Sequence, residues 1–296
     1  MLCIVYVITV GTLLGVAGLL VERALPAPFP RRLVWLVVIA LSVVIPGVYR
    51  ARHTMPVTDG LAHADSFGGP ISQLGLFASA LLLILAAANM WRVSHAVSLS
   101  RRQTGANRPA MVDGVPVVVT DSLGPATVGL LRSRVLVPRW VLALPGVQRR
   151  YVIRHEEEHR RAHDARLLFA ASLPLILMPW NIALWWQLRR LSLAVEMDCD
   201  NRVVSALGDA TVYGELLLKV AQAASRGPRL QPAFLGAGML EHRLTAMLAP
   251  APLRQIQRLL LPAVACVLLF VVLLMPHPIL GHEAHAHSTM TRSPKP

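Results

Sequence analysis

Four long stretches of the sequence carry no charged side chain: residues 1–21, 33–49, 71–91 and 259–275. A helix that crosses a bilayer needs about 20 predominantly apolar residues, with about 17 as the lower limit. Each stretch is therefore predicted to span a membrane. The first is interpreted as a permanent anchor, because no basic segment precedes its apolar run. Apolar residues make up 54% of the chain and charged residues only 15%, which excludes an ordinary soluble domain.

The net charge of +13 comes almost entirely from arginines, many of which flank the apolar stretches. Loops on the cytoplasmic side of a membrane carry an excess of basic residues. We therefore predict that the N-terminus lies outside, residues 92–258 lie in the cytoplasm and the C-terminal tail lies outside. Because the positive charge is assigned to topology, no direct binding to nucleic acid is expected. The arginines that support this orientation are Arg23, Arg31, Arg32, Arg92, Arg101, Arg102, Arg108, Arg254 and Arg258.

Between the third and fourth apolar stretches the pattern becomes that of a folded domain. Residues 105–115 are rich in turn formers and are predicted to be a linker. Short β-branched runs at 115–121 and 134–138 predict strands. Helices are predicted at 147–164, 188–206 and 209–225, with Asp209 as the N-cap of the last. Residues 167–187 are long enough to span a membrane, but Pro174 and Pro179 divide them into short halves.

Residues 155–159 read HEEEH. Residues four apart lie on one face of a helix, so His155 and His159 can bind one metal ion. Glu156 is then placed to accept a proton from a water molecule that the ion activates, which is the HExxH pattern of zinc hydrolases. The alternative is a polar helix face without a ligand. In an unbroken helix His163 lies about 12 Å along the axis from His155, so it is expected outside the site.

A catalytic zinc ion takes three protein ligands and leaves one position open. The best source of a third ligand is the run VEMDCDNR at 195–202, where Glu196 and Asp200 share a helix face. Glu196 is predicted to bind the metal, and Asp200 to accept the far N–H of a ligand histidine. The alternative is a helix with ordinary surface acids. Cys199 is interpreted as a small buried side chain and not as a redox gate.

The path of residues 167–187 follows from this pairing. If they crossed the membrane once, His159 and Glu196 would lie on opposite sides and could not share an ion. The segment is therefore either a re-entrant helical hairpin, broken at Pro174 and Pro179, or a buried or interfacial core of the domain.

Taken together, these motifs resemble the membrane metallopeptidases of family M56, the zinc-protease parts of the BlaR/MecR-type antibiotic sensor-transducers. The resemblance extends over about residues 70–275 and implies a gluzincin-like site, with zinc on His155, His159 and Glu196 and with Glu156 as the base. It also implies supporting roles for Asp164 and Asp200 behind the ligands. The matching features are HExxH, Asp164, Pro179-Trp180-Asn181, Trp185-Trp186, the ExxCD pattern at 196–200, and the stretch 125–138.

The expected fold is a mostly α membrane protein with about four transmembrane helices and an inserted cytoplasmic, gluzincin-like α+β zinc-protease domain. Residues 1–104 hold three membrane helices, 105–255 the peptidase domain, and 256–296 the last membrane helix with a short histidine-containing tail. The chain has Trp180-Asn181 where the family commonly has Asn-Pro. Only 21 residues follow Met275. β-Lactam receptors carry a penicillin-binding domain there, so direct antibiotic sensing is not expected.

The leading hypothesis is a signal-transducing zinc endopeptidase that cleaves a cytoplasmic protein, such as a winged-helix repressor, or itself. The strands at 115–121 and 134–138 can present a sheet edge to an extended substrate. One alternative is a quality-control membrane protease of the HtpX or CAAX-prenyl-protease type, and another is a non-catalytic receptor with a structural zinc ion. The expected partners are the lipid bilayer and a protein substrate, and a homodimer is left open.

Overall fold

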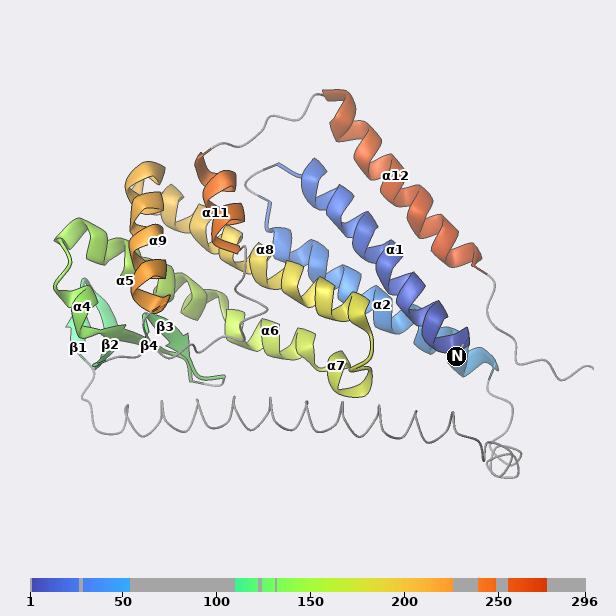
Figure 1. Ribbon diagram of the computed structural model, residues 1–296, viewed down its shortest axis with the longest axis horizontal. Coiled ribbons are helices and arrows are strands. Elements are labelled where there is room, and N and C mark those ends of the chain that lie inside the picture. The colour runs from blue at the N-terminus through green and yellow to red at the C-terminus, as the bar shows by residue number, and fades with distance from the viewer. Residues whose placement is uncertain are drawn as a thin grey trace, which may run out of the picture.

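The computed structural model describes residues 2–26, 29–53, 110–121, 124–130, 132–225, 239–248 and 255–275. Within these ranges the fold is mostly helical, with one small sheet (Figure 1). The predicted membrane span at 71–91 and the C-terminal tail from residue 276 onwards lie outside the described residues.

Three long apolar helices lie together at one end of the molecule: α1 (Leu2–Ala24), α2 (Arg31–His53) and α12 (Gln255–Leu274). Each contains a run that is long and apolar enough to cross a membrane, at Ile4–Ala24, Arg31–Val48 and Ile256–Leu274. These runs coincide with the predicted spans at 1–21, 33–49 and 259–275. The apolar helices indicate a membrane protein.

The segment around residues 167–187 is a broken helical path. Helix α6 (Asp164–Ser172) is followed by the short α7 (Pro174–Leu177) and then by the long α8 (Ile182–Leu207). Pro174 stands in the first turn of α7, where its missing N–H has no helical partner to lose. The Asn181 side chain accepts the N–H of Leu184 at 3.3 Å and starts α8 six residues earlier than predicted. Helices α6 and α7 both pack against α8, so the chain turns back on itself.

The first half of α8 packs into the membrane helices through small residues of α1. A Cβ atom at Gly15 would lie only 2.1 Å from Cζ3 of Trp186, and one at Gly11 would lie 3.0 Å from Cβ of Ala183. Small residues of this kind let helix backbones approach closely in membranes. The Gln187 side-chain amide donates to the Gly11 carbonyl at 2.7 Å, so close packing and a buried hydrogen bond join the same two helices.

The sheet contains β1 (Ala110–Val112), β2 (Val115–Thr120), β3 (Ala126–Val128) and β4 (Arg134–Pro138) in the order β1-β2-β4-β3. The pair β2–β4 is parallel and the other two pairs are antiparallel. Strands β2 and β4 confirm the two predicted strands. Residues 110–112 were assigned to a linker, but Asp113 and Gly114 both adopt positive φ and form the tight turn that pairs β1 with β2.

The positions of β2 and β4 correct one prediction. Both lie in the interior of the described sheet, whose edges are β1 and β3. Strand β1 pairs with residues 115–117 and β3 pairs with residues 134–136, so the prediction that the two strands present an edge is wrong for these residues.

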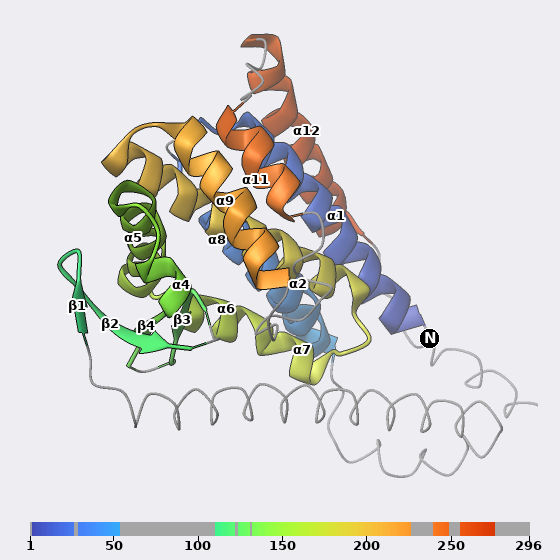
Figure 2. The same cartoon turned by 60° about the vertical axis from the view of Figure 1, so that its left-hand side comes forward.

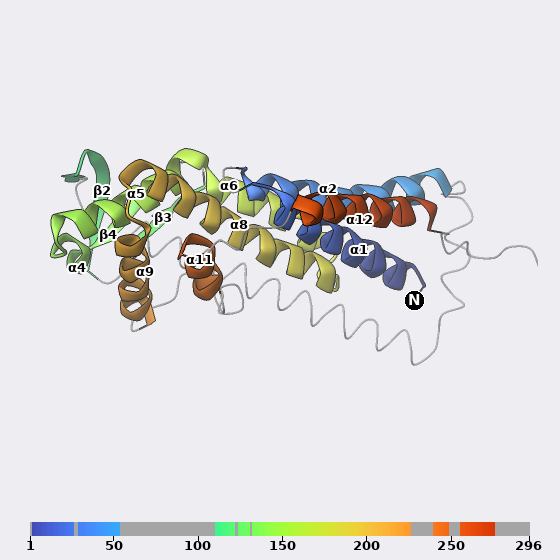
Figure 3. The same cartoon turned by 90° about the horizontal axis from the view of Figure 1, so that it is seen from above.

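A second apolar core lies between the sheet, α5 (Gly146–Ala162), the end of α8, α9 (Ala210–Ser225) and α11 (Met239–Leu248). The short helix α4 (Arg139–Leu142) follows β4 directly. Oδ1 of Asp209 accepts the N–H groups of Thr211 and Val212 at 3.1 and 3.0 Å, which confirms Asp209 as the N-cap of α9. Helix α8 contributes to both cores and joins the membrane end to the sheet end (Figures 2 and 3).

The contact between Gly15 and Trp186 gives a direct test of this packing. Gly15→Ala should lower the free energy of unfolding by about 1–3 kcal/mol, because the added methyl group overlaps the indole ring. Gly47→Ala in α2 is the matched control, since nothing lies within 4 Å of the new atom. Thermal unfolding in detergent micelles should separate the two variants, and equal unfolding temperatures would contradict the packing.

Candidate metal centre

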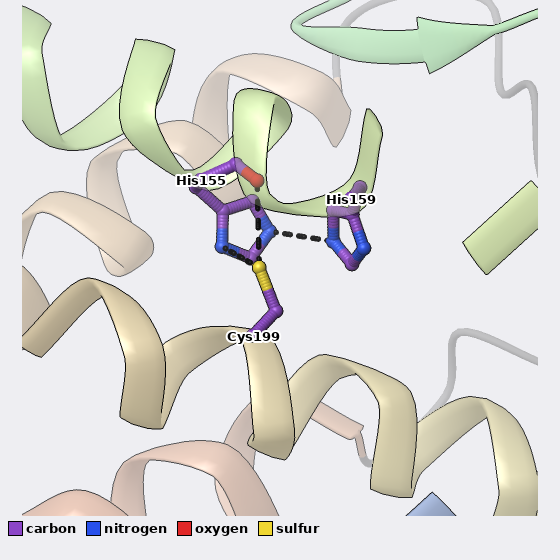
Figure 4. Close-up of side chains that lie close together, drawn as sticks. All are labelled: His155, His159 and Cys199. Carbon is purple, nitrogen blue, oxygen red and sulfur yellow. Dashed lines mark hydrogen bonds between the residues drawn. The ribbon is translucent and has the colours of Figure 1, made fainter. Parts of the chain in front are cut away.

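Helix α5 carries His155 and His159 on one face, one turn apart. Their Nε2 atoms lie 3.1 Å from each other, and the two rings are nearly perpendicular, at 89° (Figure 4). Two imidazole nitrogens so close together, each able to point a lone pair at the same place, are suited to sharing one cation.

Glu196 approaches the same two nitrogens from α8. Its Oε2 lies 3.5 Å from Nε2 of His155, and its Oε1 lies 3.7 Å from Nε2 of His159. Nitrogen and oxygen ligands around a tetrahedral zinc ion are about 3.4 Å apart, given the usual bond lengths. The observed separations of 3.1, 3.5 and 3.7 Å bracket this value. These three side chains therefore fit a zinc ion as a donor set.

Cys199 lies one turn further along α8 and is fully buried. Its Sγ is 3.3 Å from Nδ1 of His155, whereas the other ring nitrogen of His155 lies beside His159 (Figure 4). One ligand atom each from Cys199, His155 and His159 can be chosen so that all lie within 4.8 Å of one another. The cysteine is thus a second candidate for the third ligand, beside Glu196, whose two carboxylate oxygens lie 3.5 and 3.7 Å from the Nε2 atoms of the two histidines.

Asp164 holds His159 from behind. Its Oδ2 lies 2.7 Å from Nδ1 of His159. The predicted helix at 147–164 ends earlier, at Ala162, because His163 adopts a left-handed conformation with φ of 56°. This break turns Asp164 back toward α5 as the first residue of α6. His163 itself contacts the carbonyl of Arg160.

Tyr213 links His155 to Asp200. The sequence predicts a direct hydrogen bond from a ligand histidine to Asp200, but Oδ1 of Asp200 lies 3.5 Å from Nδ1 of His155. The Tyr213 hydroxyl oxygen lies 2.8 Å from that nitrogen and donates to Oδ1 of Asp200 at 2.7 Å. Because this hydroxyl gives its proton to Asp200, it accepts the Nδ1–H of His155. Tyr213 was not identified from sequence, where it is one of four tyrosines.

The hydrogen bonds behind both rings fix their tautomers. His155 donates from Nδ1 to Tyr213, and His159 donates from Nδ1 to Asp164. In the neutral form of each ring, the Nε2 atom is then left with a lone pair toward Glu196. This is the arrangement in which imidazole binds a metal.

Arg243, on α11, neutralises two carboxylates of α8. It makes two 2.7 Å hydrogen bonds to Asp200, and its Nη1 lies 2.9 Å from Oε2 of Glu196. Burial raises the pKa of the Glu196 carboxyl, but Arg243 and His159 outweigh burial and hold that pKa well below its ordinary value. Glu196 is therefore anionic. Arg243 was not identified from sequence, because nothing local distinguishes it from the other arginines.

The centre as a whole favours positive charge. Burial lowers the pKa of His155, yet the sulfur of Cys199 and the Glu196 carboxylate outweigh burial and raise that pKa to about 10. The pKa of His159 is also raised, since Glu196 and Asp164 outweigh its burial. Protons on the two rings can satisfy this demand for positive charge, and so can a divalent cation that displaces them.

Glu156 is buried next to His155 and is tied to the edge of the sheet. The Thr127 hydroxyl, on β3, lies 2.7 Å from the backbone carbonyl oxygen of Glu156 and 3.1 Å from its Oε2. Glu157 and Glu158, the next two residues, form ion pairs with arginines. Glu157 is bonded by Arg160 and Arg161, and Glu158 by Arg154 and Arg202.

A family model described as BlaR1 peptidase M56 matches residues 74–247, more than half of the chain. The chain belongs to the M56 peptidase family. This membership makes it a membrane-associated metallopeptidase of the BlaR1 type, from a family whose members are generally zinc-dependent. The match includes every residue of the candidate metal centre. No curated protein and no solved structure matches this M56 peptidase.

The buried charge balance around Arg243 can be tested without metal. In the presence of a chelator, Arg243→Met should lower the free energy of unfolding by about 3–5 kcal/mol, because it leaves the buried Asp200 and the mostly buried Glu196 without their shared cation. Arg139→Met is the control, since Arg139 and its partner Asp121 are 77% and 84% exposed, and its unfolding temperature should barely change. Similar losses in both variants, measured by thermal unfolding in detergent, would contradict this account.

Proposed function

We propose that this M56 peptidase is a membrane-embedded zinc endopeptidase that transmits a signal by cleaving a cytoplasmic protein, such as a winged-helix transcriptional repressor, or by cleaving itself. The observation that carries the proposal is the convergence of Nε2 of His155, Nε2 of His159 and the carboxylate of Glu196. The match to BlaR1-type peptidases supports the signalling role.

In this proposal His155, His159 and Glu196 hold one zinc ion and leave a fourth position open for substrate or water. When bound, the ion supplies Lewis-acid chemistry, which polarises a peptide carbonyl and makes a water molecule more acidic. Asp164 and Tyr213 keep both histidines in the tautomer that this requires. Arg243 keeps Glu196 ionised. It cannot bind the metal ion itself, because a guanidinium group has no lone pair to donate.

Glu156 is the proton carrier of the proposed reaction. Its carboxylate accepts a proton from the attacking water and then delivers it to the amine that leaves. The Thr127 hydroxyl restrains that carboxylate at 3.1 Å, so the base is held in a fixed orientation relative to β3.

Strand β3 is the edge on which we propose that the substrate binds. Among the described strands it pairs only with β4, and it lies against α5, which carries Glu156. An extended peptide can add to such an edge through main-chain hydrogen bonds, and this aligns its backbone beside the base. The proposed docking edge is therefore β3, and not β2 or β4, which lie inside the described sheet.

The orientation in the membrane is proposed from the same geometry. The α1–α2 connection and the start of α12 lie at the end of the apolar helices that faces the metal centre (Figure 1). The start of α1 and the end of α12 then lie at the far end (Figure 1). With arginine-rich segments inside, the metal centre is cytoplasmic, and the N-terminus and the C-terminal tail are outside.

A structural zinc site in a non-catalytic receptor is the second candidate function, and Cys199 is the observation that favours it. Structural sites are closed by four protein ligands, and the cysteine sulfur is the nearby group that could close this one. The contact of Cys199 with Nδ1 of His155, and not with the Nε2 atom that faces Glu196, argues for the open, catalytic arrangement. The family match also favours M56 over the HtpX or CAAX-prenyl-protease alternative.

Replacement of the base should separate metal binding from catalysis. Glu156→Gln should retain one zinc ion per chain and cleave at least about 100-fold more slowly, because the amide cannot accept the proton. Cleavage would be followed in purified full-length protein, by mass spectrometry of its own fragments and of a co-expressed winged-helix repressor. Glu157→Gln is the control, since its side chain is bonded by Arg160 and Arg161 and should leave cleavage intact. Equal rates for Glu156→Gln and wild type would refute the assignment.

Two substitutions on α8 distinguish an open site from a closed one. Glu196→Ala should lose most bound zinc, whereas Cys199→Ala should keep it, with metal content measured per chain after dialysis. The reverse result would make Cys199 the ligand and would favour the structural-zinc alternative.

A further inference from the structure

The first turn of α2 reaches directly to the candidate metal centre. Nη1 of Arg32 donates to Oδ1 of Asp164 at 2.9 Å, and the other oxygen of that carboxylate lies 2.7 Å from Nδ1 of His159. Asp164 is buried, with 2% of its surface exposed, so this ion pair is largely shielded from solvent. Two consecutive hydrogen bonds thus connect a predicted membrane helix with a proposed metal ligand.

A second contact joins the same turn to α8. The backbone N–H groups of Arg31 and Arg32 donate to the two oxygens of Asp198 at 3.0 and 3.1 Å. The first N–H groups of a helix have no partner within the helix and carry partial positive charge. Asp198 therefore caps α2 from another helix. It is buried and stands two residues beyond Glu196.

Asp164 and Asp198 are each close to a different proposed metal ligand. Asp164 stands behind His159, and Asp198 stands beside Glu196 on α8. The first turn of α2 contacts both acids, so a shift of α2 changes the position of His159 relative to Glu196. Nε2 of His159 and Oε1 of Glu196 are 3.7 Å apart. Ligand atoms must keep such distances within a few tenths of an ångström to bind zinc tightly.

The membrane hairpin is built so that α1 and α2 move together. Glu22 of α1 accepts the indole N–H of Trp35, in α2, at 2.9 Å and pairs with Arg190 of α8 at 2.7 Å. Trp35 is fully buried and meets Trp186 edge to face. A displacement of α1 is therefore carried to α2 and α8 through buried contacts.

We propose that Arg32 is a positioning residue of the metal centre, and that the first turn of α2 couples the membrane hairpin α1–α2 to zinc affinity. The inference rests on the proposed function in that the centre binds zinc. The coupling is reciprocal, as linkage requires: zinc binding tightens the contacts of the α2 turn, and a displaced hairpin weakens zinc binding.

The test uses full-length protein in detergent with zinc as the probe. Arg32→Gln removes the nearer of two cations from Asp164, with Arg202 left 3.9 Å away, and should weaken zinc binding about 10-fold, the lower end of what loss of a supporting contact costs. Arg32→Lys restores a cation there and should recover most of the affinity. Arg31→Gln makes the same charge change in the same turn but loses only a 3.8 Å contact to the sulfur of Met197, so its affinity should stay near that of wild type.

Hydrogen exchange of the Arg31 and Arg32 amides gives a readout that does not depend on any variant. Both amides donate to Asp198, so zinc should slow their exchange several-fold in wild type, and Arg32→Gln should reduce this effect. The inference is overturned if zinc binds wild type without changing this exchange, or if Arg32→Gln and Arg31→Gln weaken zinc binding equally. If wild type takes up no zinc, the proposed function itself fails.

Discussion

Two carboxylates on one face of α8, with Asp200 fully buried and the Glu196 side chain 18% exposed, impose the constraint that organises the rest of the centre. Glu196 and Asp200 lie one turn apart in an interior where an ionised acid is stable only beside a positive partner. Arg243 supplies one positive charge and contacts both acids. The second positive charge that the two carboxylates need comes from protons on His155 and His159 or from a metal cation bound by them. The side chains of α5, α9 and α11 around this face are therefore polar, although the core next to them is apolar.

Helix α8 makes the membrane part and the metal centre one continuous structure. Its first half packs against α1 and α2 through Trp186 and Gln187, and its second half carries Glu196 and Asp200. An α-helix is stiff over such a length, about 39 Å for 26 residues. The position of the membrane helices is consequently transmitted to the site without a flexible joint. The apolar helices and the charged metal centre are therefore connected through one helix, α8.

Local sequence patterns predicted the parts of this structure that depend on neighbours along the chain. The spacing of His155 and His159, the spacing of Glu196 and Asp200, and the cap at Asp209 all follow from helix periodicity and capping rules. The family model independently covers that region. Strand β1 lies in a segment predicted to be a linker, because the Asp113-Gly114 turn that pairs it with β2 is equally typical of a linker.

Contacts between distant segments could not be found in this way. Arg32 is 132 residues from Asp164, and Arg243 is 43 residues from Asp200. Each is one arginine among many, and only packing of the helices distinguishes it. The same holds for Tyr213, which stands between His155 and the acid that was predicted to contact it directly. His163 shows a different limit: a single left-handed residue ended the helix where no glycine or proline marked the end.

The cap that Asp198 places on α2 has a consequence for anyone who wishes to work with the catalytic part alone. A water-soluble fragment that begins at β1 would lack Arg32, the nearer cation of Asp164, and the backbone N–H groups that Asp198 accepts. It would also expose the apolar surface of α8 that α1 and α2 cover. The peptidase part and the apolar helices therefore do not form separate folding units. The smallest fragment that keeps these contacts includes the hairpin α1–α2.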